Sequence, residues 1–552
     1  MTEEKTLKRI AIGESDFKKI REAGYYYVDK TEMISEIHNQ AQAFVFNIPE
    51  HFGKTTILSM IDAFYNMEYK GNDWFDGLKI TEYGKYADVM NSRPVINLKM
   101  KDVRGPDYQS FVEGLRKVVS DALRPFSDLR DCEKLNEWTR EIFLKTPDSF
   151  SLSELMFSME RLCAGVVEAY GKKPIVLVDD YDAPLINTVG CEDFDTIVSE
   201  LIHFYSCFVK GNDDVDFTVL ASLMHWKEFL QPDLNNVSRH NMVRNQCCKN
   251  FVFTADEVME LCNYYGHPEK YEEAKEWYGG YLIEDTESFN PWSILNYVCN
   301  GFKTDDYWAD FNKNRLINTA LDRYLAKDCL AMKRLATWNC DDFYEPLYIS
   351  LMDLKSDPYV IGDLLPYLGY FKVVYRSLPY YEYKHEENIP NREIYDAFRT
   401  SMMKLVTEDA IIAYGELLEG MEKTDMDMMK NALNMMLTKN IPFIVLSDID
   451  DFSLILATMT FYCRGKYSIE KVYVHAAKRI LIKANDGGLP NIALTLKKSD
   501  AKTMKGLKAS ATELSQVKIE SDYCIKIEGR TLAYSVCTNG DEFAISFKEV
   551  NL

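Results

Sequence analysis

The sequence predicts an α/β fold whose first domain is a parallel sheet carrying a phosphate-binding loop (P-loop). Two stretches predict it. Residues 44–60 read as an apolar strand, a tight turn and a helix that opens on Gly53-Lys54-Thr55. Residues 172–184 contain a short β-branched apolar run that ends in Asp179 and Asp180. Buried parallel strands deliver such acids to the carboxyl edge of a sheet, so we expect the loop and the acids to meet there.

The turn after the first strand has residue types that suit a phosphate. Gly53 lets backbone N–H groups approach an anion, Lys54 neutralises phosphate charge, and the Thr55 hydroxyl can ligate Mg²⁺. The full pattern also has a glycine five residues before Gly53, where this chain has Ile48. A short Gly-Lys-Thr run is common by chance, so an ordinary strand–turn–helix unit remains the alternative. The predicted nucleotide-binding residues are Phe52, Gly53, Lys54, Thr55 and Thr56.

The second stretch offers the acids that a P-loop enzyme needs. Asp179, with Thr55, is the predicted Mg²⁺ ligand, and Asp180 is the predicted catalytic residue that polarises the attacking water. Taken alone, the same residues also fit a buried strand followed by an acidic turn. The two stretches occur in the order that a P-loop fold requires, which favours the first interpretation.

Length and composition fit a globular protein. A chain of 552 residues can hold two to four domains, and 47% apolar with 27% charged residues is an ordinary balance. The net charge of −22 opposes non-specific binding to nucleic acid or anionic lipid, which needs clustered Lys and Arg. We therefore expect no membrane partner, and nucleic acid is a disfavoured partner.

Cysteine usage and apolar runs bear on the compartment. The 13 cysteines are scattered without C-x-x-C spacing, and Cys247-Cys248 is the one close pair, so neither a zinc site nor a disulfide framework is indicated. The first residues lack the apolar core of a signal peptide, and no apolar run approaches the length of a membrane span. These features predict a cytoplasmic protein.

The N-terminal segment reads as two short helices before the first strand. Residues 10–24 suggest an extended lead-in and a helix capped by Ser15 and closed by Gly24, and Thr31 is expected to start a helix over residues 32–39. With Phe17 and residues 27–31, the loop from Phe52 to Thr55 and residues 178–184 resemble the bacterial AAA-ATPase-like proteins that carry a PD-(D/E)XK nuclease-like domain at their C-terminus. The resemblance implies ATP and Mg²⁺ as cofactors.

The resemblance extends through the middle of the chain, to about residue 400. The motifs that carry it there lie at residues 253–258, 276–281, 289–293, 307–308, 368–370 and 389–394. These motifs also have a local meaning. Thr254 and Glu257 form a capping box before a helix, Gly279-Gly280 ends the next helix, and Pro291 suits a first helical turn. We expect the aromatic residues of this region, Trp277, Tyr281, Trp292 and Trp308, to form the core of a helical lid rather than a substrate site.

Three departures from the family bear on activity. The family's Arg-Pro-Arg-Arg before Phe-Gly-Lys is Ile48-Pro-Glu-His51 here, which removes three cations and adds a carboxylate beside a triphosphate. The second acid is Asp180 where the family has Glu, so its reach differs by about an ångström or more. The family's Thr-Gly pair after a later strand is Ala221-Ser222, and only residues 234–236 keep part of that pattern. We expect weak nucleotide binding with slow or absent hydrolysis.

The C-terminal third changes character from about Arg399. Met-rich helices over residues 421–436 precede strands over residues 471–475, 479–483 and 492–497, where the resemblance implies a restriction-endonuclease-like α/β domain. The methionines are expected to be core rather than a binding groove.

A PD-(D/E)XK site needs carboxylates for Mg²⁺ on two strands. Those positions hold Leu481 and Thr495, and Lys497 is the remnant of the motif; Glu470 and Asp486 are nearby acids that could partly rescue a site. Nuclease activity is therefore not expected.

The sequence thus predicts three regions. Residues 1–250 form a P-loop NTPase domain, residues 251–400 a mainly helical middle region, and residues 401–552 a degenerate nuclease-like domain. The preferred function is weak Mg-ATP binding. The alternatives are a non-enzymatic scaffold that contacts a protein partner or a second copy of the chain, and an ATPase that remodels nucleic acid.

Overall fold

The structure is a computed structural model. It describes residues 7–224, 226–230, 237–242, 246–283, 286–308, 316, 349–353, 360–377, 383–403, 408–438, 467–474, 477–484, 488–516 and 529–551. Residues 234–236, His475 and Asp486, which the sequence analysis names, lie outside these ranges. The described residues divide into two compact units, one ending at Asp396 and the other beginning at Ala397. The boundary placed at residue 250 falls inside the first unit, and the one placed at residue 400 lies near the division.

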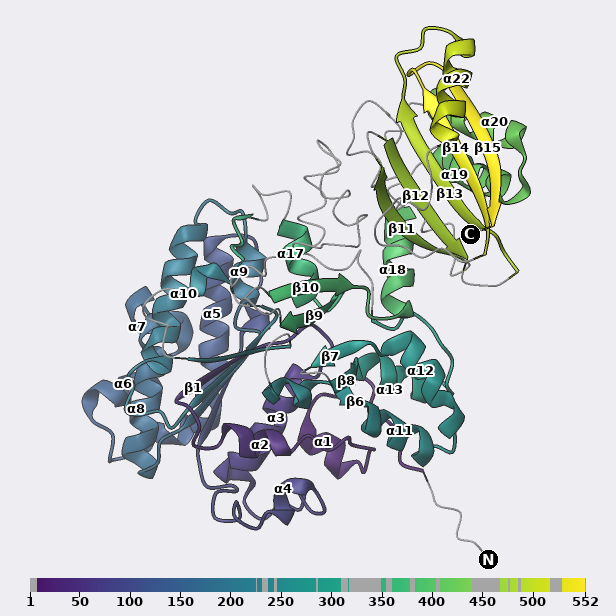
Figure 1. The fold of residues 1–552 in the computed structure, drawn as a ribbon. Coiled ribbons are helices and arrows are strands. Elements are labelled where there is room, and N and C mark those ends of the chain that lie inside the picture. Colours follow the sequence, from purple (N-terminus) through teal and green to yellow (C-terminus); the bar gives the residue numbers. More distant parts are fainter. Residues whose placement is uncertain are drawn as a thin grey trace, which may run out of the picture. The chain divides into compact units, whose positions relative to one another are not determined.

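The first unit is built on a five-stranded parallel sheet (Figure 1). Its strands are β1 (Ala43–Asn47), β2 (Val95–Lys99), β3 (Ile175–Asp179), β4 (Thr218–Ser222) and β5 (Ser238–Asn241). The spatial order is β2-β3-β4-β1-β5, so β4 separates the strand before the loop from the strand that ends in the acids. The structure therefore confirms that both predicted strands belong to one parallel sheet.

Helices cover both faces of this sheet because its strands are apolar on both sides. All five residues of β1 are buried. Figure 1 shows the first four helices on one face and the next six on the other. These helices are α1 (Phe17–Glu22), α2 (Glu32–Ile37), α3 (Lys54–Tyr65), α4 (Lys79–Glu82), α5 (Tyr108–Leu123), α6 (Glu137–Leu144), α7 (Leu152–Met156), α8 (Ser158–Tyr170), α9 (Ala183–Thr188) and α10 (Phe194–Val209).

The start of α1 differs from the prediction. Its N-cap is Asp16, whose side chain accepts a hydrogen bond from the backbone N–H of Lys18, and not Ser15. Ser15 lies instead on the wall of a cavity described below. The next helix, α2, begins after Thr31 as expected but ends at Ile37. Both Asp and Ser make good N-caps, so residue type alone does not choose between adjacent candidates.

The remainder of the first unit is helical with two small sheets that the prediction omitted. The helices are α11 (Ala255–Tyr264), α12 (Tyr271–Tyr278), α13 (Pro291–Cys299) and α17 (Val360–Tyr367). Three short antiparallel strands, β6 (Phe253–Thr254), β8 (Thr286–Phe289) and β7 (Tyr281–Ile283), lie side by side in that order, and β9 (Lys372–Ser377) pairs with β10 (Tyr383–Asn388). The capping box of Thr254 and Glu257 is present at α11, and α12 ends before Gly279-Gly280 as predicted.

The second unit is a mixed five-stranded sheet with helices. Helix α18 (Arg392–Met403) leads into it, followed by α19 (Glu408–Lys423), α20 (Met426–Thr438) and α22 (Met504–Ser515). The strands, in spatial order, are β11 (Tyr467–Val474), β12 (Ala477–Ala484), β13 (Asn491–Lys498), β14 (Arg530–Thr538) and β15 (Phe543–Asn551). Only β13 and β14 pair in parallel.

The Met-rich helices pack on one face of this second sheet. Met421, Met429 and Met436 are at most 1% exposed and contact the apolar residues of the strands. The methionines are therefore core, as the sequence analysis expects. Among the described residues of the whole chain, the helices are too short or too polar to cross a membrane.

Candidate functional site

The loop after β1 is fixed from behind by apolar contacts. Ile48 and Phe52 are fully buried. The Phe52 ring packs edge-on against Tyr281 and Trp308, at centroid distances of 5.5 and 5.7 Å. Gly53 then begins α3 with a φ of +82°, in the left-handed region that favours glycine. These contacts hold the loop in a defined shape in front of the helix N-terminus.

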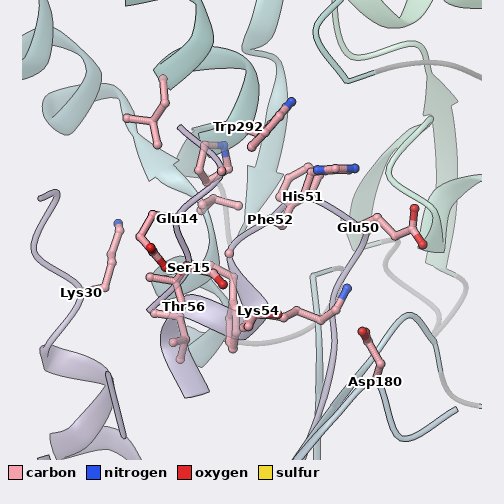
Figure 2. A pocket seen from close by; sticks show the side chains of 18 of the residues that line it. Glu14, Ser15, Lys30, Glu50, His51, Phe52, Lys54, Thr56, Asp180 and Trp292 are labelled. Carbon is pink, nitrogen blue, oxygen red and sulfur yellow. The ribbon is translucent and has the colours of Figure 1, made fainter. Parts of the chain in front are cut away.

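Lys54 lies beneath the loop rather than in solvent. Its side chain is only 7% exposed, and its Nζ donates to the carbonyl oxygens of Ile48 at 2.8 Å and Pro49 at 3.0 Å. Figure 2 shows the Lys54 amine at the same end of the pocket as Asp180, with Trp292 at another side. The charge is therefore held at the loop, where a bound phosphate would take over hydrogen bonds now made by the carbonyl groups.

Thr55, at the start of α3, contacts Asp179, at the end of β3, although β4 lies between β1 and β3. The Thr55 Oγ1 donates to Oδ2 of Asp179 at 2.8 Å. The other carboxyl oxygen, Oδ1, is buried and has no hydrogen-bond partner in the part of the chain that is described. Burial, and then the charge of Asp180, raise the pKa of Asp179, while Thr55 and Lys54 oppose this rise. A buried carboxyl oxygen without a donor is stabilised by a cation, so this pair fits a Mg²⁺ ion.

Asp180, the predicted catalytic acid, follows directly in a left-handed conformation, with a φ of +53°. Asp is among the few residues that adopt this conformation readily. The turn places Asp180 on the wall of the same cavity as Lys54 and Thr55. The catalytic role of Asp180 stays a prediction.

A cavity of about 560 Å³ extends from the loop, a size that is common for small-molecule pockets. Its wall includes the loop residues and Asp180. The same wall carries the aromatic residues Tyr26, Phe253 and Trp292, with Glu14 and Ser15 as polar groups. The His51 and Trp292 rings lie 5.2 Å apart. The five predicted nucleotide-binding residues, Phe52, Gly53, Lys54, Thr55 and Thr56, all line this cavity.

The middle aromatics divide between core and cavity. Tyr281 is buried and donates its hydroxyl to the Gly369 carbonyl at 2.9 Å, and Trp308 stacks on Tyr370 at 5.1 Å. These residues form core, as expected. Trp292 instead lines the cavity, and Trp277 lies beside the Arg392 guanidinium, 4.6 Å from the ring centroid.

Glu393, in the segment 389–394, binds two earlier segments of the first unit. The Glu393 carboxylate accepts from Ser293 Oγ at 2.8 Å and from the backbone N–H groups of Tyr307 and Trp308, both at 2.7 Å. Burial raises the pKa of Glu393 to about 7, although these donors oppose the rise. Glu393 thus links the segments that contain Ser293 and Trp308 within the first unit.

Two buried polar residues near Asp179 and Asp180 form hydrogen bonds within the protein. Asp182 accepts from Trp226 Nε1 at 2.9 Å and from the backbone N–H of Leu223 at 3.2 Å, and burial raises its pKa to about 7. Ser222, which ends β4, is fully buried and accepts from Asn47 Nδ2 at 2.7 Å. Ser222 therefore binds a neighbouring strand end instead of lining the cavity.

The sequence analysis missed two cations of the cavity wall. Lys101 and Arg104 follow β2 and line the same cavity as Asp180. The available signal was a second apolar run, residues 94–98, followed by basic residues, which reads as one more parallel strand with charged residues at its carboxyl end. Lys30, also on the cavity wall, is held by Glu257 at 2.6 Å.

The positions that the sequence analysis aligned with a nuclease motif hold no carboxylates. Leu481 is 1% exposed, Thr495 accepts from Arg479 Nε at 2.9 Å, and Lys497 is exposed. Within the described residues, no three His, Cys, Asp or Glu side chains gather as a metal site would require.

Comparisons with known proteins extend this description. Residues 11–225 match the model of a family described as "Predicted AAA-ATPase". An uncharacterized protein from the vnfD 5′ region of Azotobacter chroococcum mcd 1 is 23% identical over 338 residues, 58% of this chain and 60% of that protein. The chain thus spans about 60% of the length of this curated relative. The N-terminal part of the chain is AAA-ATPase-like, since the match includes the loop and both acids.

Two solved structures also align with this chain. The Walker-type ATPase PABY2304 of Pyrococcus abyssi aligns with 12% identity and a TM-score of 0.35, over 71% of this chain and 99% of that chain. The ORC1 protein of Aeropyrum pernix, solved in complex with DNA, aligns with 9% identity and a TM-score of 0.23, over 71% of this chain and 93% of that chain.

Proposed function

We propose that the first unit binds Mg-ATP weakly and hydrolyses it slowly or not at all. One observation carries the proposal: Asp179 accepts a hydrogen bond from Thr55, a residue of the cavity wall, and keeps a second, buried carboxyl oxygen without a partner among the described residues. Lys54 lines the same cavity. An acid, a hydroxyl and an amine in this arrangement suit a divalent cation and a phosphate chain together.

Different residues would bind the phosphate chain, the Mg²⁺ ion and the rest of the nucleotide. The N-terminus of α3 and the backbone N–H groups after Gly53 attract an anion, and Lys54 adds a full positive charge. Thr55 and Asp179 would hold Mg²⁺, which screens the phosphate charges when bound. The cavity of about 560 Å³, whose wall includes Tyr26 and Trp292, has room for the rest of the nucleotide.

Three features support weak binding and slow turnover. The loop carries Glu50 where a cation would help, the Lys54 amine must leave two carbonyl partners to meet a phosphate, and Asp180 has a shorter reach than Glu. We expect an affinity in the high-micromolar range or weaker. The scaffold function is the rival, because those two bonds of Lys54 hold the loop closed without any ligand.

A calorimetric titration of the full chain with Mg-ATP tests the proposal. The variant Glu50→Arg should bind about 2- to 10-fold more tightly than the natural protein, because a repulsive charge becomes an attractive one. Solvent screening limits this gain in affinity, since Glu50 is exposed on the cavity wall. The matched control is Glu133→Arg, at an exposed glutamate that does not line the cavity. This variant should leave the affinity for Mg-ATP unchanged. Absence of binding in both the natural protein and Glu50→Arg would favour the scaffold.

We also propose that the second unit is a nuclease-like fold without nuclease activity. The antiparallel strands β11 to β13, followed along the chain by α22 and a strand parallel to β13, support the fold. Leu481 and Thr495 cannot ligate Mg²⁺ as carboxylates do. Incubation of the pure protein with DNA or RNA and Mg²⁺ should yield no cleavage. Cleavage that disappears in Lys497→Ala would contradict this proposal.

A further inference from the structure

The loop supplies little positive charge to the end of a phosphate chain. Of its residues, Ile48 is apolar and buried, Glu50 is an acid, and His51 has its pKa lowered, chiefly by burial. Lys54 is the one cation of the loop, and its amine already bonds two carbonyl oxygens. A terminal phosphate beside Asp179 and Asp180 therefore needs a cation from another element.

Lys101 stands where such a cation is needed. It belongs to the 3₁₀ turn Met100–Asp102, which follows β2 directly. Strand β2 lies next to β3, and the register pairs Lys99 with Asp179, so the turn continues past the acids at the carboxyl edge of the sheet. Lys101 lines the same cavity as Thr55 and Asp180.

The charge of Lys101 also reaches the loop. It lowers the pKa of His51, which burial already lowers. Lys101, Lys54 and Asp180 line one cavity wall, so a terminal phosphate of a nucleotide held by Lys54 would meet this wall.

The neighbouring charges leave Lys101 available to a ligand. Arg104 donates from Nε to the Lys101 carbonyl oxygen at 3.1 Å, and Lys117 pairs with Asp102 at 3.4 Å. These contacts shape the turn and occupy its acid. Lys101 itself is exposed and forms no ion pair with any residue in the described ranges.

We propose that Lys101 contacts the terminal phosphate of a bound nucleoside triphosphate and makes the site prefer triphosphate over diphosphate. The inference rests on the proposed function of the first unit. A diphosphate lacks the group that Lys101 would meet, so the preference follows from that one contact.

The test compares Mg-ATP with Mg-ADP on the full chain by calorimetry. In Lys101→Gln, the affinity for Mg-ATP should fall about tenfold, and that for Mg-ADP less than about twofold. Lys101→Arg should keep most of the preference for Mg-ATP over Mg-ADP, because the positive charge remains. The matched control is Lys117→Gln, which removes a positive charge beside the same turn without touching the cavity and should leave both affinities unchanged.

The outcomes distinguish the role of Lys101 from the proposed binding of Mg-ATP by the first unit. If Lys101→Gln leaves the ratio of the two affinities unchanged while Lys54→Ala abolishes both, the role of Lys101 is wrong and the nucleotide site stands. If Lys117→Gln changes the ratio as much as Lys101→Gln does, the effect is one of general charge and the contact is wrong. If the natural protein binds neither nucleotide, both the inference and the proposed function fail.

Discussion

Lys54→Ala is expected to abolish the binding of Mg-ATP, with a loss of more than about 100-fold in affinity. The substitution removes the one loop cation at the phosphate position. It also removes the two hydrogen bonds that Nζ donates to Ile48 and Pro49, so the loop loses an internal support as well. Calorimetry on the full chain at millimolar nucleotide measures the loss.

Two controls separate the loss of charge from a damaged loop. Lys54→Arg keeps the charge and a donor to the carbonyl oxygens, so it should retain measurable binding while Lys54→Ala does not. Circular dichroism of the two variants should match that of the natural protein, because α3 keeps its apolar face with Ile57, Ile61 and Phe64. Tight binding that survives in Lys54→Ala would mean that the nucleotide binds elsewhere.

Glu393→Ala is expected to lower the free energy of unfolding of the first unit by about 3–5 kcal/mol at pH 6. The carboxylate satisfies three donors, the Ser293 hydroxyl and the N–H groups of Tyr307 and Trp308, at a position where Glu393 is 1% exposed. Truncation leaves buried donors unpaired, and each costs about 1–3 kcal/mol. Denaturant unfolding followed by tryptophan fluorescence measures the change, since Trp292 and Trp308 flank the site.

The isosteric variant Glu393→Gln gives this prediction a pH dependence. Burial raises the pKa of Glu393 from 4.5 to about 7, so the folded state holds the proton more tightly than the unfolded state. The resulting stability is fully present below about pH 4.5 and is lost as the pH rises through 7. The natural protein should lose about 3 kcal/mol relative to Glu393→Gln over this interval. A difference that stays constant from pH 4.5 to 8 would contradict the assignment, and Glu416→Gln, outside the contacts of Glu393, is the control.

The sequence predicted those parts of the fold whose signals are local. The runs 44–46 and 175–178 are apolar and rich in β-branched or aromatic residues, and each is followed by residue types that suit the carboxyl edge of a parallel sheet, so both the strands and their shared edge could be inferred. The capping box at Thr254 and the glycine pair after α12 are equally local. In each case the interacting residues are only a few positions apart in the sequence, and the structure confirms both features.

The missed residues act through contacts between distant parts of the chain. Lys101 matters because β2 happens to lie beside β3, which no local pattern in residues 95–104 reveals. Glu393 reads as an ordinary polar residue of a helix start, and only the fold brings Ser293 and Trp308 to it. The strands β6, β7 and β8 are two to four residues long, too short for an alternation of polar and apolar residues to be seen.

The outer wall of the phosphate-binding loop has a consequence for the order in which the chain folds. Gly369 has a φ of +81°, and a Cβ there would lie 3.2 Å from Pro49 and 3.2 Å from Trp308, so only glycine lets this segment close over the loop. Strand β1 and α3 leave the ribosome long before Gly369 is synthesised. Until then the apolar back of the loop, including Phe52, has no partner from this segment. The loop therefore reaches its final shape late in synthesis, and a nascent chain that stops short of Gly369 lacks a segment that covers the loop in the finished protein.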